Sequence, residues 1–324
     1  MKAAVVNTLG RAPAYTDFDD PRPQNGLAVA TVEAASLKNL DRGLVSGTHY
    51  GSASLRLPSV AGVDGVARLA DGRLVYTGAI APYGMMAERA LIDPERVVDL
   101  PAGVDPVLGA AVPNPGLSAW FSLEYAARVQ PGQNVLILGA TGVTGALAVQ
   151  LAKVQFGAGR VVVAGRNAAR LDWLRTVCAD HVISLGTDDL AERVAVEHNS
   201  HPIDVVLDYL WGSPAEQVLA GLGGYHLAAT FHAMRYVQVG SMAGPTINLP
   251  AGILRSAGIE LLGLGIGSVP AEAQARVGSE LLPKLFELVA DGSLQMDAQA
   301  RPLSDVEELW TATEPSGTRI VLVP

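Results

Sequence analysis

Residues 134–166 constrain the fold more than any other part of the chain, and they read NVLILGATGVTGALAVQLAKVQFGAGRVVVAGR. An apolar run, a glycine-rich turn, a helix-compatible run and a second apolar run follow one another there. This order predicts a strand, a helix and a parallel strand, with an anion-binding turn between the first strand and the helix. The uncharged run at 135–138 is typical of a parallel strand that is covered on both faces.

The turn carries Gly139, Gly142 and Gly145 at intervals of three residues. The first glycine permits a tight turn, the second lets backbone N–H groups approach a pyrophosphate, and the third lets the helix lie close to the strand. The N–H groups and the dipole at the start of the helix favour an anion. We therefore predict a dinucleotide-binding turn of the Rossmann type, although the spacing G-x-x-G-x-x-G differs from the commoner G-x-G-x-x-G. A glycine-rich turn with no ligand is the alternative.

The end of the second strand indicates which dinucleotide binds. An acidic residue about 20 residues after the glycines normally binds the ribose 2′-hydroxyl of NAD. Gly165, Arg166 and Asn167 occupy that place here. Arg166 can bind a 2′-phosphate through charge-assisted hydrogen bonds, and Arg170 can add a second charge. The sequence therefore predicts NADPH rather than NADH, with a solvated arginine at a strand end as the alternative.

Composition narrows the class of protein. The 324 residues suffice for one large or two ordinary domains. A net charge of −9 argues against nucleic acid or an anionic membrane surface as the main partner. The single cysteine, Cys178, excludes a disulfide framework and a Cys-rich metal site, and its apolar neighbours predict a packed thiol. No secretory signal or membrane span is recognisable, so a cytoplasmic location is expected.

The pattern of apolar and turn-forming residues changes near residue 113. Before it, short strand-like runs lie between Gly, Pro, Asn and Asp, and the segment 104–111 is the first expected helix. After it, strand-like and helix-like runs alternate, which predicts an α/β domain with a doubly wound parallel sheet. A long helix is expected from after Ser268 to Leu288, and the last strand, 318–323, is expected to return to the first domain.

Several further segments carry a resemblance to a known family. They are MKAAVV at the start, NLDRGLVSGTHY at 39–50, PSVAGVDGVARL at 58–69, AAVPNPGLSAWFSL at 110–123, VQPGQNVLILGATG at 129–142, DVVLDYLWG at 204–212 and TRIVLVP at the end. In this order and spacing the chain resembles the medium-chain dehydrogenase/reductase superfamily and, within it, the zinc-free quinone oxidoreductases. The resemblance implies a Rossmann cofactor-binding domain at 113–268. It also implies a discontinuous, β-rich, GroES-like catalytic domain at 1–112 and 269–324.

The same resemblance bears on zinc. Zinc dehydrogenases of the superfamily carry cysteines where this chain has Lys38 and Asn114, and a His-Glu pair where it has Val63 and Asp64. Lysine, valine and asparagine cannot form a Cys/His zinc shell, and one cysteine cannot supply a four-cysteine site. No metal is therefore expected.

The resemblance implies that NADPH supplies a hydride to a quinone or another activated double bond. Reduction of an enoyl thioester or an α,β-unsaturated carbonyl is the alternative within enzymes, and a catalytically weak NADPH-binding protein is the alternative outside them. The candidate catalytic residues are Asn39, Asp41, His49 and Tyr50. Many relatives carry a tyrosine eight residues after the aspartate, where this chain has His49, with Tyr50 next. Either residue could donate a proton, or both could be loop residues that contact solvent.

The remaining candidates would bind the cofactor or join two subunits. The proposed cofactor-binding residues are Ser118, Gly139, Thr141, Gly142, Val143, Gly145, Arg166, Asn167, Arg170, Asp208, Gly240, Ser241, Leu264 and Gly265. Ordering of the neighbouring turn is the alternative role for Asp208. The apolar run Glu260 to Leu264 is expected to form an edge strand, which predicts a homodimer.

Overall fold

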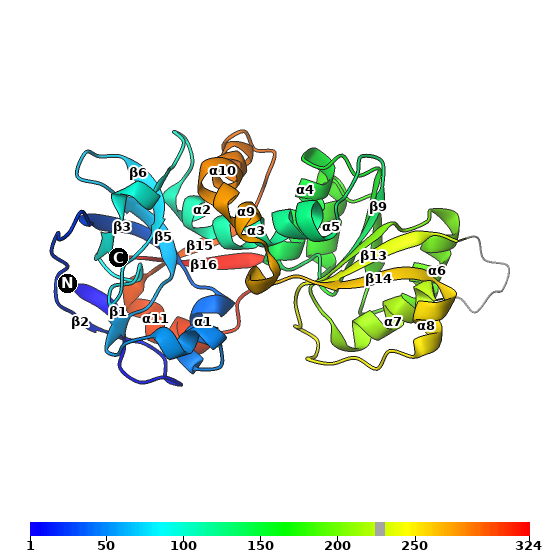
Figure 1. Cartoon of the computed structure of the whole chain (residues 1–324), viewed down its shortest axis with the longest axis horizontal. Coiled ribbons are helices and arrows are strands. Elements are labelled where there is room, and N and C mark those ends of the chain that lie inside the picture. The colour runs from blue at the N-terminus through cyan, green and yellow to red at the C-terminus, as the bar shows by residue number, and fades with distance from the viewer. Residues whose placement is uncertain (224–230) are drawn as a thin grey trace. The chain divides into compact units, whose positions relative to one another are not determined.

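The computed structural model describes residues 1–223 and 231–324, without the side chains of Tyr50 and Ser54 (Figure 1). The chain divides into a first unit, Met1–Asn114 with Ala275–Pro324, and a second unit, Pro115–Gln274. The sequence predicts these boundaries at 112/113 and 268/269. The two divisions of the structure fall inside helices α3 (Pro113–Phe121) and α9 (Ala271–Arg276), whereas the composition changes where those segments begin.

The second unit contains a six-stranded sheet in which every pairing is parallel. Its order is β11-β10-β9-β12-β13-β14, so the chain moves outward from β9 in one direction and then outward from β9 in the other. The strands are β9 (Asn134–Leu138), β10 (Arg160–Gly165), β11 (His181–Ser184), β12 (Val205–Asp208), β13 (Ala233–Gln238) and β14 (Gly258–Gly263). This is the doubly wound α/β arrangement that the sequence predicts.

Helices cover both faces of this sheet (Figure 1). Those on one face are α4 (Val143–Val154) and α5 (Ala168–Val177), and those on the other are α6 (Leu190–Ser200), α7 (Gly212–Leu222) and α8 (Ala251–Ser256). The second face buries an apolar core in which Leu136 and Val206 of the sheet meet Val194 of α6 and Leu219 of α7. The buried runs 135–138, 161–164 and 205–207 of the central strands are therefore apolar, because they are covered on both sides. Among the residues that the structure describes, no helix is long and apolar enough to cross a membrane.

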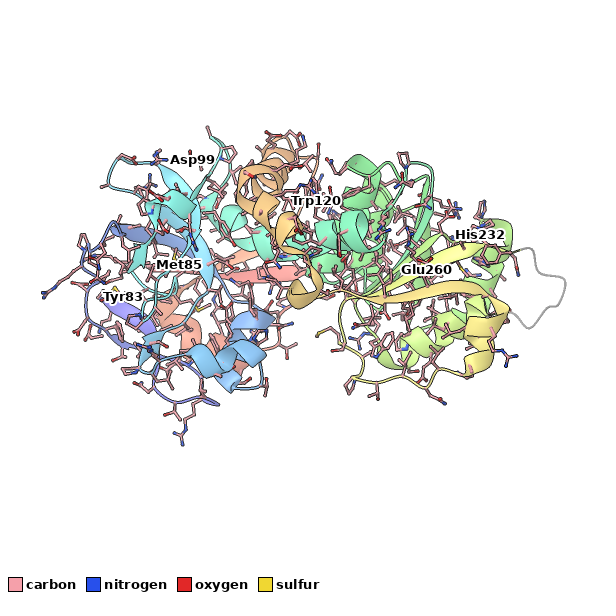
Figure 2. All side chains as sticks on the ribbon, in the orientation of Figure 1. Tyr83, Met85, Asp99, Trp120, His232 and Glu260 are labelled. Atoms are coloured by element: carbon pink, nitrogen blue, oxygen red, sulfur yellow. The ribbon has the colours of Figure 1, made fainter. Side chains whose placement is uncertain are left out.

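The first unit is β-rich. One sheet has the order β2-β1-β4, and the other has the order β15-β16-β3-β5-β6-β8, with β7 paired to β3. The strands are β1 (Lys2–Val6), β2 (Ala14–Asp17), β3 (Ala28–Ser36), β4 (Ser59–Val60), β5 (Asp64–Arg68), β6 (Leu74–Gly78), β7 (Arg89–Ile92), β8 (Val98–Asp99), β15 (Asp297–Pro302) and β16 (Thr318–Val323). Met85, labelled in Figure 2, is fully buried in the main core of this unit. The last strand, β16, pairs with β3, so the chain returns to its first domain as expected.

Short helices complete the first unit. They are α1 (Asn39–Ser46), the 3-10 helix η1 (Tyr50–Ser54), the 3-10 helix η2 (Pro94–Arg96), α2 (Pro106–Ala111), the π-helical segment η5 (Val277–Leu281), α10 (Leu282–Ala290), the 3-10 helix η6 (Leu303–Asp305) and α11 (Val306–Thr311). In the second unit, the π-helical segment η3 (Ser122–Ala126) continues α3, and the 3-10 helix η4 (Ile266–Ser268) follows β14.

Among the elements that differ from the sequence prediction, three have a clear physical reason. The long helix expected between 269 and 288 is broken by η5, and Pro283 stands in the first turn of α10, where its missing N–H ends the regular ladder. The polar run that forms β15 was not predicted as a strand, because its side chains are largely exposed and show no apolar alternation. Helix α1 was also missed, and its first turn is set by a contact with a distant part of the chain.

Candidate functional site

The glycine-rich turn after β9 is held by the end of β10. The N–H groups of Gly139 and Ala140 both donate to the carbonyl of Ala164, at 2.9 and 3.1 Å. Gly139 has a φ of +78°, a conformation that glycine adopts without the cost a Cβ imposes. The end of one strand therefore fixes the backbone that begins the candidate diphosphate site.

The third glycine of the turn permits close contact between α4 and the turn. A Cβ on Gly145 would lie 2.4 Å from the Gly139 carbonyl oxygen and 2.8 Å from the Ala140 Cα. Gly142 is the N-cap of α4 and makes no side-chain cap bond, and the first N–H groups of a helix have no partner within it. These groups can donate to an anion placed at the start of α4.

The end of β10 carries the predicted 2′-phosphate residues. Arg166 is exposed directly after the strand. Asn167 is the N-cap of α5, and its side-chain oxygen accepts from the Arg170 N–H at 3.1 Å, so this side chain orders the helix start. The Arg170 guanidinium carbon lies 4.2 Å from the centre of the Trp173 ring. No sequence motif marks Trp173, although its spacing from Arg170 places both on one face of a helix.

The other cofactor candidates of the second unit lie at the same edge of the sheet. Strand register aligns Leu138 with Asp208, Asp208 with Gln238 and Gln238 with Gly263. Ligands of parallel α/β sheets bind outside the carboxyl ends of the strands, next to the point where the strand order reverses. The turns after β9, β12, β13 and β14 all begin at this edge.

Asp208, a predicted cofactor-binding residue, is bonded to other parts of the protein and is not exposed to a ligand. It is fully buried, and its carboxylate accepts from the N–H groups of Leu210 and Trp211, at 2.8 and 2.9 Å, and from the Tyr236 hydroxyl at 2.8 Å. Burial raises the pKa of Asp208, and these three donors oppose that rise. The carboxylate thus orders the turn after β12, where Trp211 has a φ of +56°. No sequence pattern indicated that Tyr236 is its partner.

The remaining candidates of this unit differ in exposure. Ser241 and Gly265 are exposed, whereas Leu264 is buried. Gly240 packs against the backbone of the turn after β12, because a Cβ there would lie 2.5 Å from the Tyr209 carbonyl oxygen. Ser118 lies in α3. Thr141 is buried beside β10, and Val143 opens α4.

In the first unit, the candidate catalytic residues lie in α1, in η1 and at the N-cap of η1. Asn39 is exposed at the start of α1. The Gly51 N–H donates to Nδ1 of His49, at 3.0 Å, so a neutral His49 carries its proton on Nε2. Tyr50 begins η1, but its side chain lies outside the part that the structure describes.

The resemblance predicts that Asp41 lines the active site, but the structure buries its side chain. Asp41 is 2% exposed. Its two carboxylate oxygens accept from the backbone N–H groups of Lys38 and Val63, both at 3.0 Å. The carboxylate therefore joins the start of α1 to the start of β5, and it offers no surface to a substrate.

Two of the positions where zinc dehydrogenases of the superfamily carry metal ligands, 38 and 64, form an ion pair in this structure. Lys38 Nζ lies 2.8 Å from Asp64 Oδ1, and Asn114 lies in α3. Within residues 1–223 and 231–324, no group of three or more His, Cys, Asp or Glu side chains is arranged to hold a metal ion.

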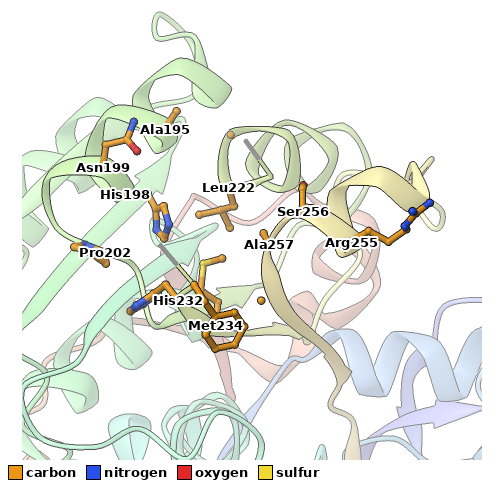
Figure 3. Close-up of a pocket in the computed structure, with 13 residues that line it drawn as sticks. Ala195, His198, Asn199, Pro202, Leu222, His232, Met234, Arg255, Ser256 and Ala257 are labelled. Atoms are coloured by element: carbon orange, nitrogen blue, oxygen red, sulfur yellow. The ribbon is translucent and has the colours of Figure 1, made fainter. Parts of the chain in front are cut away.

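A separate cavity of about 650 Å³ lies at the opposite edge of the second unit's sheet (Figure 3). The ends of α6 and α7, helix α8 and the residues just before β13 and β14 form its walls. The His198 and His232 rings are 5.7 Å apart beside it, and burial followed by the neighbouring His232 lowers the pKa of His198. This edge holds the amino ends of the strands, so the cavity is distinct from the candidate nucleotide site.

Comparisons with known proteins agree with this architecture. Residues 143–276 match the family model described as zinc-binding dehydrogenase. The protein named probable NADPH-dependent quinone reductase of Emericella nidulans is 26% identical, with 100% of both chains covered. The crystal structure of the quinone oxidoreductase from Thermus thermophilus has a TM-score of 0.80 and 25% identity, again over 100% of both chains.

A third relative is much longer. A mycocerosic acid synthase-like polyketide synthase of Mycobacterium tuberculosis is 29% identical over 96% of this chain, which spans only 15% of that protein. The parallel sheet and the β-rich first unit agree with the fold of the T. thermophilus enzyme. Together these likenesses support a quinone oxidoreductase-like protein of the medium-chain dehydrogenase/reductase type.

Proposed function

We propose that this protein is an NADPH-dependent oxidoreductase that transfers a hydride to a quinone or another activated double bond without zinc. The observation that carries the proposal is the glycine turn at the start of α4, followed at the end of β10 by an exposed arginine in place of an acid. The E. nidulans relative is named as a quinone reductase dependent on NADPH, and it matches this chain from end to end.

Each part of the second unit would have a role in holding the cofactor. The N–H groups at the start of α4 would bind the diphosphate, and Arg166 with Arg170 would bind the 2′-phosphate. The exposed residues after β13 and β14, Ser241 and Gly265, would flank the nicotinamide half, with Ser118 as a further contact. When bound, NADPH supplies the hydride, and the chain orients the acceptor and excludes water.

The chemistry also needs a proton for the reduced oxygen. His49 would supply it from Nε2 as an imidazolium, which forms when Nδ1 takes a proton from solvent and gives up its bond from the Gly51 N–H. A quinol oxygen is stabilised by conjugation, so its formation does not require a metal ion. The lysine at position 38 and the asparagine at position 114 fit this metal-independent route, since neither side chain supplies the thiolate that zinc sites of the superfamily use.

An enoyl thioester or α,β-unsaturated carbonyl is the second candidate acceptor. The similarity to the polyketide synthase, which covers 96% of this chain, is compatible with such an acceptor but does not favour it over a quinone. The two candidates share the cofactor and differ in the proton acceptor, which is an oxygen in a quinol and a carbon in a reduced enoyl group. A dependable proton donor therefore matters more for the second candidate.

The proposal is tested by NADPH fluorescence on binding and by NADPH oxidation with a naphthoquinone and with crotonyl thioester. We expect binding, turnover of the quinone and full activity in protein dialysed against a zinc chelator. Quinone turnover that needs about one zinc per chain would refute the metal-independent route. Binding without turnover of any acceptor would favour a catalytically weak NADPH-binding protein.

His49→Asn should separate proton donation from the structural role of His49. An asparagine oxygen can still accept from the Gly51 N–H and keep the start of η1, but the side chain is not an acid. We expect turnover to fall at least about tenfold, with NADPH affinity and melting temperature unchanged. His49→Ala, which also removes the cap, should lower the melting temperature as well. A change of less than a few-fold in the asparagine variant would show that His49 is not the donor.

We infer that two copies of the chain pair through β14. This strand ends the sheet order, and its side chains are mostly half-buried or exposed, including Leu261. Glu260, labelled in Figure 2, projects from this edge strand and pairs with Arg235 of β13 at 3.1 Å. An edge strand of this kind offers unpaired backbone groups to a second copy. Sedimentation velocity should show a dimer that Leu261→Pro converts to a monomer, and a monomeric wild type would exclude the pairing.

A further inference from the structure

Lys38 lies at the centre of a buried group of charges in the first unit. It is 1% exposed, and its Nζ lies 2.8 Å from Asp64 Oδ1 and 3.5 Å from Asp41 Oδ2. The Tyr76 hydroxyl also hydrogen-bonds to Asp64. A fully buried lysine is rare and needs ionised partners. The proposed reaction does not use this ammonium group, so its position requires a separate explanation.

The Asp41 carboxylate connects this group to the candidate catalytic segment. One oxygen accepts from the Lys38 N–H at the start of α1, and the other accepts from the Val63 N–H just before β5. Both oxygens accept strongly in an ionised carboxylate, whereas protonation makes one of them a hydroxyl, which is a donor and a weaker acceptor. Helix α1 begins with Asn39, and the His49 N–H donates to the Gly43 carbonyl of the same helix at 3.3 Å.

We propose that Lys38 is a positioning residue that keeps the Asp41 carboxylate ionised and so fixes the start of α1 and the candidate catalytic residues that depend on it. The part of this proposal that concerns turnover rests on the proposed reductase function. The part that concerns the ionisation of Asp41 does not.

Burial and the opposite charge of the partner have opposing effects on the pKa of Asp41 and on the pKa of Lys38. Burial raises the pKa of Asp41, Asp64 raises it further, and Lys38 is the strongest influence that lowers it; the net pKa lies above the ordinary value. Burial would lower the pKa of Lys38, but Asp41 and Asp64 together reverse this and raise it. The groups that face the Asp41 carboxylate or the Lys38 ammonium are Asp64, Tyr76 and Arg319, with Arg42 and Glu314 beyond Arg319.

Lys38→Met should move the acid limb of the kcat/KM profile to higher pH by about one unit or more, because a nearby opposite charge lowers a carboxyl pKa by about one to three units. Asp64→Asn should shift the limb to lower pH, or leave it in place, because it removes a like charge from Asp41. The double variant should lie between the two single variants. Lys284→Met is the matched control, because Lys284 forms an exposed ion pair with Glu287 in the same unit.

Thermal unfolding gives a second readout that needs no substrate. A carboxyl whose pKa is raised in the folded state destabilises the fold most at high pH, and this loss shrinks as the pH falls through the folded pKa. The melting temperature of Lys38→Met should therefore approach that of the wild type as the pH falls from neutral towards the raised pKa of Asp41 in the folded variant. Activity and relative stability of this variant would then change in opposite directions with pH, which a simple packing defect does not produce.

The outcomes separate the alternatives. A melting-temperature gap that is the same at every pH, with kcat/KM reduced equally at every pH, would overturn the proposal. If no acceptor is turned over even by the wild type, the unfolding experiment still decides the question. If Lys38→Met does not fold, the double variant compared with Asp64→Asn decides it, because equal acid limbs in these two would show that Lys38 has no influence on Asp41. Lys38→Arg keeps the charge and should retain the wild-type acid limb.

Discussion

Gly145→Val should abolish measurable NADPH binding, with an affinity loss of at least about 100-fold, which corresponds to about 3 kcal/mol. The Cβ of the new side chain would lie 2.4 Å from the Gly139 carbonyl oxygen and 2.8 Å from the Ala140 Cα. Both are backbone atoms that are fixed by β9 and β10, so α4 must move away from the turn. The N–H groups that would bind the diphosphate move with it. Overpacking of this kind also costs stability, by about 1–3 kcal/mol.

The control is Gly186→Val in the same unit, where a Cβ would meet no atom within 4 Å. We expect this variant to bind NADPH like the wild type. Gly145→Ala should have an intermediate effect, because it introduces the same Cβ without the two methyl groups. Calorimetric titration of NADPH measures the affinities, and chemical denaturation measures the stabilities. If Gly145→Val binds NADPH normally, the diphosphate does not lie at the start of α4.

The candidate nucleotide site could be predicted because its determinants are local in sequence. Gly139 and Gly145 are separated by one turn and the start of one helix, and their roles follow from backbone geometry that does not depend on the rest of the fold. The strand-turn-helix order around them fixes the parallel sheet as well. The predicted fold class is accordingly confirmed.

Contacts between distant residues could not be predicted in this way. Lys38 and Asp64 are 26 residues apart, and Asp208 and Tyr236 are 28 residues apart, in segments that no periodicity connects. Sequence patterns report which residues share a face of one element, but not which elements bring two charges together. For this reason Asp41 was expected to line a site, whereas the structure buries it against the N–H groups of two segments.

Helix α1 could not be predicted from the sequence for the same reason, because contacts with distant residues stabilise it. It has only eight residues, Gly43 lies within it, and few apolar positions mark a buried face. Such a segment has little intrinsic tendency to form a helix. It is stabilised by the Asp41 carboxylate at its first turn and by the bonds of Arg42 to the carbonyls of Leu309 and Trp310. Leu309 and Trp310 come from a distant part of the chain, which no local pattern could reveal.

Arg166→Ala should remove most of the preference for NADPH over NADH. A hydrogen bond to a charged group contributes about 1.5–3 kcal/mol, so NADPH affinity should fall by about 10- to 100-fold. NADH affinity should stay unchanged, because NADH lacks the 2′-phosphate. The exposed side chain of Arg166 follows β10 directly, where an acid would otherwise bind the ribose hydroxyls. Adding Arg170→Ala to this variant should lower NADPH affinity further, because Arg170 would contribute a second positive charge to the 2′-phosphate site. The Arg170 guanidinium lies over the Trp173 ring, in the first turns of α5.

Arg175→Ala is the matched control for this prediction, because Arg175 lies on the same helix α5 and pairs only with the exposed Asp172 among the contacts described. Salt gives an independent readout. A phosphate held by arginine at an exposed site is screened, so wild-type affinity for NADPH should fall with ionic strength while affinity for NADH stays nearly constant. Arg166→Ala should reduce that salt dependence. Equal losses of NADPH and NADH affinity would instead place Arg166 against the part that both dinucleotides share, and the prediction of NADPH from the end of β10 would then be wrong.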